Sequence, residues 1–183
     1  MASAFSHALV AITFGKSYAK KMGTTRFLIL GSVCATIPDL DVVMLRFVAY
    51  SHPLGHRGFF HSLFFCLLLA AFVMLLFYRK QNLKKKEHAI YFLYFFLCGA
   101  SHGLLDMLTN GGLGVAILAP FDNTRYFFPY TPIQVSPIGV GNFFSEWGLK
   151  VIKSELIWIA LPCLIFIVLI RILRKTKKPL ENS

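Results

Sequence analysis

Five long apolar stretches restrict what this chain can fold into. They run over Ala2–Gly15, Phe27–Phe47, Phe59–Tyr78, His88–Met107 and Glu155–Leu173. A helix needs about 20 predominantly apolar residues to cross a bilayer; the first stretch is marginal and suits a short or tilted helix. The chain is 56% hydrophobic, whereas soluble domains are about 45–50% apolar. We predict an all-α, polytopic membrane helical bundle of about five membrane segments, formed as a single domain over residues 1–183.

Basic residues gather in three clusters between and after these stretches. The clusters are Lys16, Lys20, Lys21 and Arg26; Arg79, Lys80, Lys84, Lys85 and Lys86; and Arg171, Arg174, Lys175, Lys177 and Lys178. Because Lys and Arg are enriched in cytoplasmic loops, we expect all three clusters to face the cytoplasm, with residues 174–183 as a basic cytoplasmic tail. The chain then begins outside, crosses five times and ends inside.

The charge balance points to a membrane surface. Only 8 acidic residues stand against 19 Lys and Arg, giving a formal net charge of +11. Excess base can indicate nucleic acid, but the apolar stretches favour contact with anionic lipid headgroups. We expect a membrane lipid or lipid-linked partner and no nucleic acid, and the oligomeric state stays open.

Seven ionisable side chains lie in or beside the apolar stretches. They are His7, Asp39 and Asp41 in PDLD, His56 and His61 in HRGFFHS, and His102 and Asp106 in SHGLLD. In the topology set by the loop charges alone, all seven fall on the outer side. Ionisable residues inside a membrane are candidate functional groups, and His and Asp are ligands of Zn²⁺ and similar metals. We therefore expect one shared site for a divalent metal, best fitted by Zn²⁺, with one or two ions.

Two of these motifs have a definite spacing. His102 and Asp106 are four residues apart, so on a helix they share one face; they either hold one metal ion together or form a His–Asp hydrogen bond between helices. Asp39 and Asp41 follow Pro38, where a helix bends or ends. One can bind the metal while the other caps a helix or holds a ligand imidazole, and an interfacial turn is the alternative.

The HRG motif supplies further candidates. Arg57 suits a phosphate group, or it anchors the chain at the interface by snorkelling. Gly58 allows a close backbone approach to a ligand, and His61 is the harder of the two histidines to explain structurally. His7 is either a ligand or is satisfied locally.

A long loop, Leu108–Ser154, is predicted on the outer side between the last two segments. Loops of this length are often lids or binding surfaces, and its many aromatic residues suit the membrane interface. Its acids are Asp122 and Glu146. Glu146 is a candidate catalytic acid or base, with an ordinary solvated carboxylate as the alternative.

Taken in order, these motifs resemble the YdjM-type family of bacterial inner-membrane proteins, described as metal-dependent hydrolases. The resemblance rests on His7, PDLD at 38–41, HRGFFHS at 56–62, SHGLLD at 101–106 and Pro120-Phe121. More distantly, the order looks like the all-helical zinc-dependent phospholipase C and S1/P1 nuclease fold. That resemblance implies His7, Asp39, His61 or His56, His102 and Asp106 as metal ligands, although this chain has no clear counterparts of the later histidine ligands.

The resulting hypothesis is a hydrolase of the bacterial inner membrane that cleaves a phosphodiester or ester of a lipid-like substrate at the outer face. Asp41 would act as general base or orient a ligand, and Arg57 would stabilise the anionic transition state. A metal or proton transporter is the first alternative, but it needs a polar path to both faces, and the ionisable groups stop in the outer half. A structural or partner-binding membrane protein is the second alternative.

Overall fold

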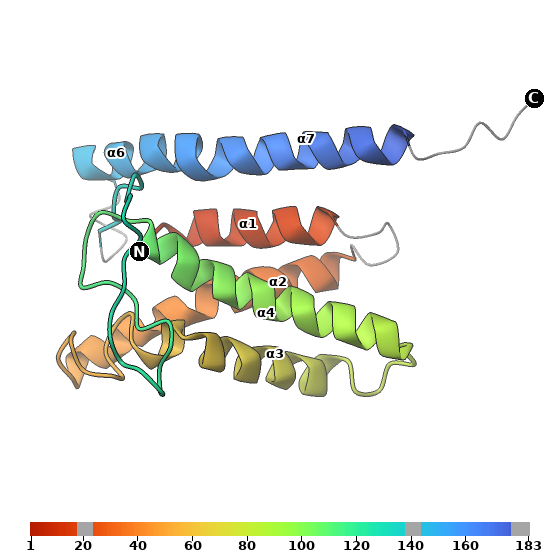
Figure 1. Cartoon of the computed structure of the whole chain (residues 1–183), viewed down its shortest axis with the longest axis horizontal. Coiled ribbons are helices and arrows are strands. Elements are labelled where there is room, and N and C mark those ends of the chain that lie inside the picture. Colours follow the sequence, from red (N-terminus) through yellow and green to blue (C-terminus); the bar gives the residue numbers. More distant parts are fainter. Residues whose placement is uncertain (18–23, 138–143, 177–183) are drawn as a thin grey trace, which may run out of the picture.

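The structure, a computed structural model, describes residues 1–17, 24–137 and 144–176. Its elements are α1 (Ala4–Ser17), α2 (Thr25–Thr36) with the 3-10 helix η1 (Ile37–Arg46), η2 (Phe59–His61), α3 (Leu63–Phe77), α4 (Lys85–Met107), α6 (Glu146–Glu155), the π-helical η3 (Leu156–Ala160) and α7 (Leu161–Thr176). The helices run lengthwise beside one another (Figure 1). In the described residues the extended pairs are two isolated bridges, so the prediction of an all-α bundle is confirmed.

Each predicted apolar stretch coincides with a helix. Three helical stretches are long and apolar enough to cross a membrane: Thr25–Arg46, Lys85–Met107 and Glu146–Thr176. α3 is apolar but has 15 residues, and α1 has 14. The fold class is therefore that of a helical membrane protein, with three helical stretches long and apolar enough to cross a bilayer.

The last helix begins earlier than predicted. α6 starts at Glu146, so the loop predicted to reach Ser154 ends nine residues before that boundary, at Ser145. The sequence of α6, EWGLKVIKSE, lacks an apolar run but buries Gly148, Val151 and Glu155 on one side. An amphipathic helix of this kind is recognised by period rather than by hydropathy.

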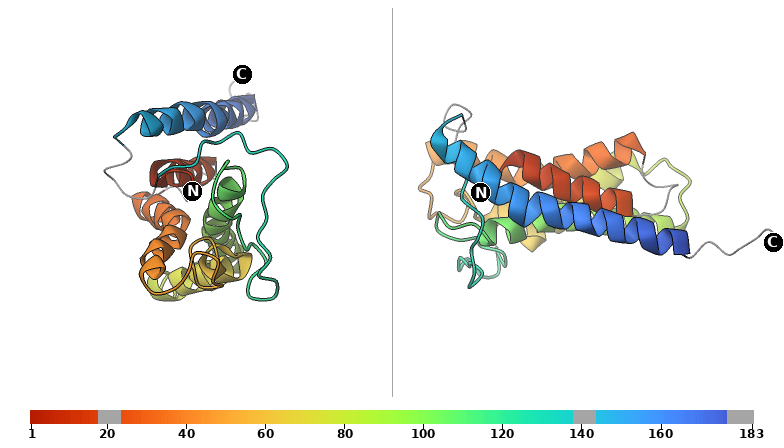
Figure 2. Two further views of the ribbon diagram at one scale, coloured as in Figure 1. Left: turned by 90° about the vertical axis from the view of Figure 1, so that its left-hand side faces the viewer. Right: turned by 90° about the horizontal axis from the view of Figure 1, so that it is seen from above.

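The core of the bundle is apolar and aromatic. Phe27 stacks on Tyr94 with ring centroids 3.9 Å apart, and both are fully buried together with Phe95. Tyr94 donates its hydroxyl to the Ala11 carbonyl at 3.1 Å. Figure 2 shows α1, α2, α3 and α4 grouped around a common centre, with α7 packed against α1. The middle of the bundle thus presents hydrocarbon and rings rather than a polar path.

The described residues of the three basic clusters gather at one end of the bundle, which we call the basic end. Arg26 donates to the Phe77 carbonyl at 2.9 Å, and Arg174 reaches the carbonyls of Lys16 and Ser17. These contacts join the end of α1, the start of α2, the end of α3 and the end of α7 (Figure 1). Lys20, Lys21, Lys177, Lys178 and the rest of the predicted tail beyond Thr176 lie outside the described residues.

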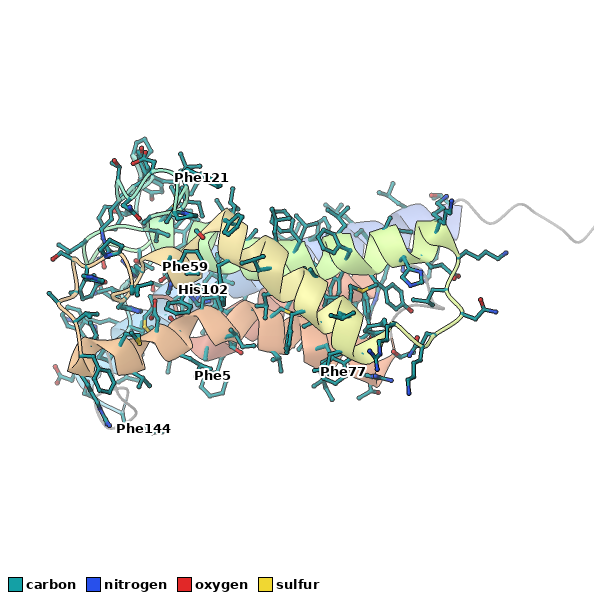
Figure 3. All side chains as sticks on the ribbon, turned by 90° about the horizontal axis from the view of Figure 1, so that it is seen from below. Phe5, Phe59, Phe77, His102, Phe121 and Phe144 are labelled. Carbon is teal, nitrogen blue, oxygen red and sulfur yellow. The ribbon has the colours of Figure 1, made fainter. Side chains whose placement is uncertain are left out.

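The opposite end, which we call the site end, is covered by the loop after α4. The Phe128 amide donates to the Met107 carbonyl at 3.0 Å, and the Ile133 amide donates to the Leu108 carbonyl at 3.1 Å. The loop therefore folds back onto the end of α4. Figure 3 shows Phe121 and Phe144 pointing outward at this end, and each is 83% exposed, as expected for aromatic residues at a membrane interface.

Candidate metal centre

All seven ionisable residues singled out above come together at the site end. α1 carries His7, η1 carries Asp39 and Asp41, the following turn carries His56, η2 carries His61, and α4 carries His102 and Asp106. Figure 3 shows His102 inside the bundle at this end. Except for Asp39, which is 10% exposed, their side chains are almost completely buried.

Four of these residues form a tight group, which we call the inner four: Asp39, His61, His102 and Asp106. One ligand atom from each lies within 4.8 Å of all the others. The Nε2 atoms of His61 and His102 are 3.0 Å apart, and Asp39 Oδ1 lies 3.3 Å from His102 Nε2 and 3.7 Å from His61 Nε2. Asp106 Oδ2 lies 3.6 Å from His61 Nε2. His102 and Asp106 thus share one face of α4, as their spacing predicted.

Hydrogen bonding fixes which nitrogen of His102 faces the group. Its Nδ1 lies 2.7 Å from the Ala35 carbonyl oxygen. A carbonyl only accepts hydrogen bonds, so Nδ1 carries the proton and Nε2 presents a lone pair to the inner four. A ligand imidazole in a metal site is oriented in this same way, through its other nitrogen.

The 3-10 geometry of η1 separates the two aspartates. With three residues per turn, residues two apart point in different directions, so Asp39 lies on the Nε2 side of the His61 ring and Asp41 on its Nδ1 side. Asp41 Oδ1 lies 2.5 Å from His56 Nδ1, and Asp41 Oδ2 accepts from the Arg57 amide at 3.1 Å. Asp41 Oδ2 is also 3.0 Å from His61 Nδ1, at an angle outside hydrogen-bond geometry. Asp41 therefore fixes the HRG turn through His56 and the Arg57 amide. It also supports His61 from the Nδ1 side of its ring.

Small residues and a cap allow the HRG motif to sit against α4. Ser62 caps the start of α3 by accepting from the Phe65 amide at 3.1 Å, so α3 begins at Leu63, two residues after His61. A Cβ on Gly103 would lie 2.8 Å from the His61 carbonyl oxygen, so glycine is needed for η2 to approach α4 this closely. A Cβ on Gly58 would lie 2.1 Å from the Pro53 carbonyl oxygen. The role of Gly58 is therefore close packing of its own turn.

Arg57 is completely buried, and each of its three guanidinium nitrogens donates a hydrogen bond. Its Nε donates to Asp106 Oδ2 at 3.1 Å. One terminal nitrogen donates to the Gly111 carbonyl at 2.6 Å, and the other donates to Thr109 Oγ1 at 2.8 Å. Its φ of +62° is uncommon for a residue with a side chain, and the surrounding hydrogen bonds hold it there. Arg57 thus ties Asp106 to the start of the long loop.

The HRG turn is clamped on its other side by Arg125, which the sequence analysis did not single out. Arg125 donates to the carbonyls of His56 and Tyr50, both at 2.9 Å, and its guanidinium lies over the Tyr50 ring at 5.6 Å. Burial raises the pKa of Tyr50, so this phenol stays protonated. Two segments of the chain that are far apart in sequence are thereby locked together over the site.

His7 lies against the inner four without joining it. Its ring stacks on His102 with centroids 3.8 Å apart, and its Nε2 is 3.6 Å from Asp106 Oδ1. Neither ring nitrogen of His7 has a hydrogen-bond partner among the described residues. His7 is thus placed to serve as an additional ligand through Nε2, beside the second oxygen of Asp106.

The two glutamates of α6 differ sharply in their surroundings. Glu146, a candidate catalytic group, is exposed on the first turn. Glu155, which the sequence analysis treated only as the edge of an apolar stretch, is buried. It accepts from the Ser3 amide at 2.5 Å, from Ser3 Oγ at 2.6 Å and from Ser6 Oγ at 2.8 Å. Its position as an acid opening an apolar stretch was the signal that could have found it.

The inner four fits a bound cation on two grounds. Both oxygens of Asp39 are buried and have no hydrogen-bond partner among the described residues, and a buried charge without a partner is costly. The four separations given above, 3.0–3.7 Å, also bracket the spacing of about 3.3 Å between ligand atoms in a tetrahedral Zn²⁺ site. Without a cation, a proton on His61 Nε2 donated to His102 Nε2 would satisfy that pair but not Asp39.

Comparisons with known proteins agree with the motif pattern. The YdjM inner membrane protein family matches residues 1–177. The chain is similar to the inner membrane protein YbcI of Escherichia coli strain K12, with 34% identity over 163 residues, which cover 88% of this chain and 92% of YbcI. No solved structure gives a significant match.

Proposed function

This chain belongs to the YdjM family of inner membrane proteins, and we propose that it is a membrane-embedded, metal-dependent hydrolase acting on an ester or phosphodiester of a lipid-like substrate. The observation that carries this proposal is the inner four, in which two Nε2 atoms 3.0 Å apart meet the unpartnered carboxylate of Asp39. A set of two imidazoles and two carboxylates suits Zn²⁺. When bound, such an ion supplies Lewis-acid activation of water and of a phosphoryl or carbonyl oxygen.

The protein's own residues divide into holding and supporting roles. Asp39, His61, His102 and Asp106 would hold the ion, with His7 as a further ligand. Asp41 contacts His56, His61 and the Arg57 amide through its two oxygens, which favours an orienting role over that of general base. Arg57 would maintain Asp106 as a carboxylate and raise the positive potential of the site; a phosphate would have to displace one of its present partners to reach it directly.

Access to the site favours a substrate that resides in the membrane. Asp39 is the ligand with an exposed fraction, at 10%, while His61, His102 and Asp106 are at 0%. The surrounding Phe121 and Phe144 suit the lipid–water boundary. With the basic end in the cytoplasm, as the positive-inside bias predicts, the site end would face the periplasm and α7 would end in the cytoplasm.

Transport is less well supported than hydrolysis. A transporter needs polar groups along the whole path, whereas the bundle beyond the site is filled by Phe27, Tyr94 and Phe95. The ionisable cluster stays at one end. A structural role for the His–Asp network is the remaining alternative, and metal content separates it from the proposal.

The experiment combines metal content with hydrolysis. Protein purified without chelators should contain about one equivalent of metal or more and should release product from a panel of phospholipid and lipid-ester substrates. His102→Ala should lose both, whereas His52→Ala, in an exposed turn, should keep both. Wild-type protein without metal would contradict the proposal and favour the structural role. Metal without hydrolysis of any substrate in the panel would contradict the hydrolase assignment.

A further inference from the structure

A groove on the surface of the bundle runs between α1 and α2, which lie side by side (Figure 1). It has a volume of about 480 Å³. α1 contributes Ala8, Ile12 and Lys16, and α2 contributes a stripe from Thr25 to Thr36. Ala8 is next in sequence to His7, so one end of the groove lies at the site and the other, at Lys16, lies at the basic end.

The helical repeat of α2 directs the groove toward Asp39, the metal ligand that is 10% exposed. Leu28, Ser32 and Thr36 line it at intervals of four residues, which is the spacing of one helix face. The next positions on that face are Asp39 and Leu40, at the start of η1, and Leu40 is largely exposed. Asp39 is also the partly exposed member of the inner four. The groove therefore points along α2 toward Asp39.

The groove wall is apolar in character despite its hydroxyl groups. Ser32 Oγ donates to the Leu28 carbonyl at 3.0 Å, and Thr36 Oγ1 donates to the Ser32 carbonyl at 3.0 Å. Both hydroxyl protons are thus used within α2, and the wall offers methyl and methylene groups to an occupant. Such a wall suits a hydrocarbon chain, whereas a sugar or peptide would leave polar groups without partners.

The groove extends along the whole of α2. Eleven residue steps from Thr25 to Thr36 span about 17 Å at 1.5 Å per residue. Since α2 is part of a stretch long and apolar enough to cross the membrane, the groove opens toward lipid tails. A chain lying in it would have its head at the level of Asp39.

We propose that this groove binds an acyl chain of the lipid substrate and brings the bond to be cleaved to Asp39. The inference rests on the proposed function and deepens it, because it makes the substrate an acyl lipid that enters sideways from the bilayer. Substrate selection then depends on the fit of a chain between α1 and α2.

Photo-crosslinking in a bilayer tests this inference. The protein is placed in nanodiscs of phosphatidylethanolamine and phosphatidylglycerol that contain a trace of phosphatidylethanolamine with a photoreactive group at the end of one acyl chain. Labelled peptides are then mapped. We expect the wild-type label to be enriched on α1 and α2 several-fold over the exposed face of α3, which contacts only bulk lipid.

Groove-filling variants complete the test. Ala8→Phe and Ser32→Phe, both at half-buried positions, should each reduce groove labelling to the level of α3. Leu68→Phe, on the exposed face of α3, should leave groove labelling unchanged. Equal labelling of the groove and α3, or enrichment that survives in both groove variants, would overturn the inference.

Metal content measured on the same samples separates this inference from the proposed function. Groove variants should keep the wild-type metal content, which also shows that they are folded. Enriched groove labelling in a protein without metal would refute the metal-dependent hydrolase and leave acyl binding standing. Bound metal without enriched labelling would refute acyl binding and leave the metal centre standing.

Discussion

The Nε2 atoms of His61 and His102 face each other across 3.0 Å at the site end of the bundle. His102 reaches this position because its Nδ1 is held by the Ala35 carbonyl, and His61 because its own Nδ1 side lies against Asp41. Two imidazole nitrogens at this distance, beside the unpartnered carboxylate of Asp39, suit a cation bound between them.

Asp41 should affect metal affinity without being a ligand. Asp41→Asn removes the carboxylate behind His61 and His56, and loss of such a supporting group typically weakens metal binding by about 10–100-fold. Competition with a fluorescent chelator measures the change. Asp122→Asn, in the loop, is the matched control and should bind metal as the wild type does. An Asp41→Asn protein with unchanged affinity would remove Asp41 from the site.

Arg57 should be needed for stability as well as for the site. Arg57→Met removes the closest charged partner of the buried Asp106 and leaves the N-terminal ammonium at 3.9 Å. Breaking a buried ion pair from one side costs about 3–5 kcal/mol. Arg57→Lys should also destabilise, because three separate nitrogens of the guanidinium each have their own partner and an ammonium cannot reproduce that fork. Unfolding in detergent measures both, with Arg46→Lys at the exposed end of η1 as control. If Arg57→Lys unfolds like wild type, the fork geometry is unimportant.

Glu155 should stabilise the fold through the start of the chain. Glu155→Leu leaves the Ser3 amide and the hydroxyls of Ser3 and Ser6 without their acceptor, and each buried unsatisfied group costs about 1–3 kcal/mol. Glu146→Leu, on the same helix but exposed, should change the free energy of unfolding by less than about 0.5 kcal/mol. The same pair tests the sequence prediction for Glu146: hydrolysis that is lost in Glu146→Leu would assign it a catalytic role.

The two ends of the bundle should lie on opposite sides of the membrane. Lys85→Cys at the basic end and Asn123→Cys in the long loop are both exposed positions. The natural Cys34, Cys66 and Cys98 are buried and Cys163 is partly exposed, so a Cys163→Ala background suffices. A membrane-impermeant thiol reagent applied from the periplasm should label Asn123→Cys alone. Labelling of Lys85→Cys from that side would reverse the proposed orientation.

The sequence predicts the helices well where hydropathy decides. The stretches that became α1 to α4 are apolar runs, and their ends at Pro38 and Ser62 are marked by ordinary breaking and capping residues. Hydropathy does not predict the start of α6, because EWGLKVIKSE is amphipathic and buries only part of its surface. Hydropathy alone cannot separate such a segment from a loop.

The sequence predicts which residues gather at the site, but it does not predict which of them face the metal position and which support those residues. Spacing placed His102 and Asp106 on one face, and loop charges placed the other groups at the same end. The separation of Asp39 from Asp41 depends on ten residues of 3-10 helix, a length that short-range propensity does not predict. The partners of Arg57, at Thr109 and Gly111, are about fifty residues away, so only the tertiary structure identifies them.

X-ray absorption spectroscopy of protein loaded with one equivalent of Zn²⁺ tests the central claim most directly. The inner four predicts about four nitrogen and oxygen ligands at about 2.0–2.2 Å, with the outer-shell scattering of two imidazoles. His102→Ala should lose one imidazole, and His52→Ala should leave the spectrum unchanged. A spectrum with oxygen ligands alone, with sulfur, or with no change in His102→Ala would contradict a metal centre built from Asp39, His61, His102 and Asp106.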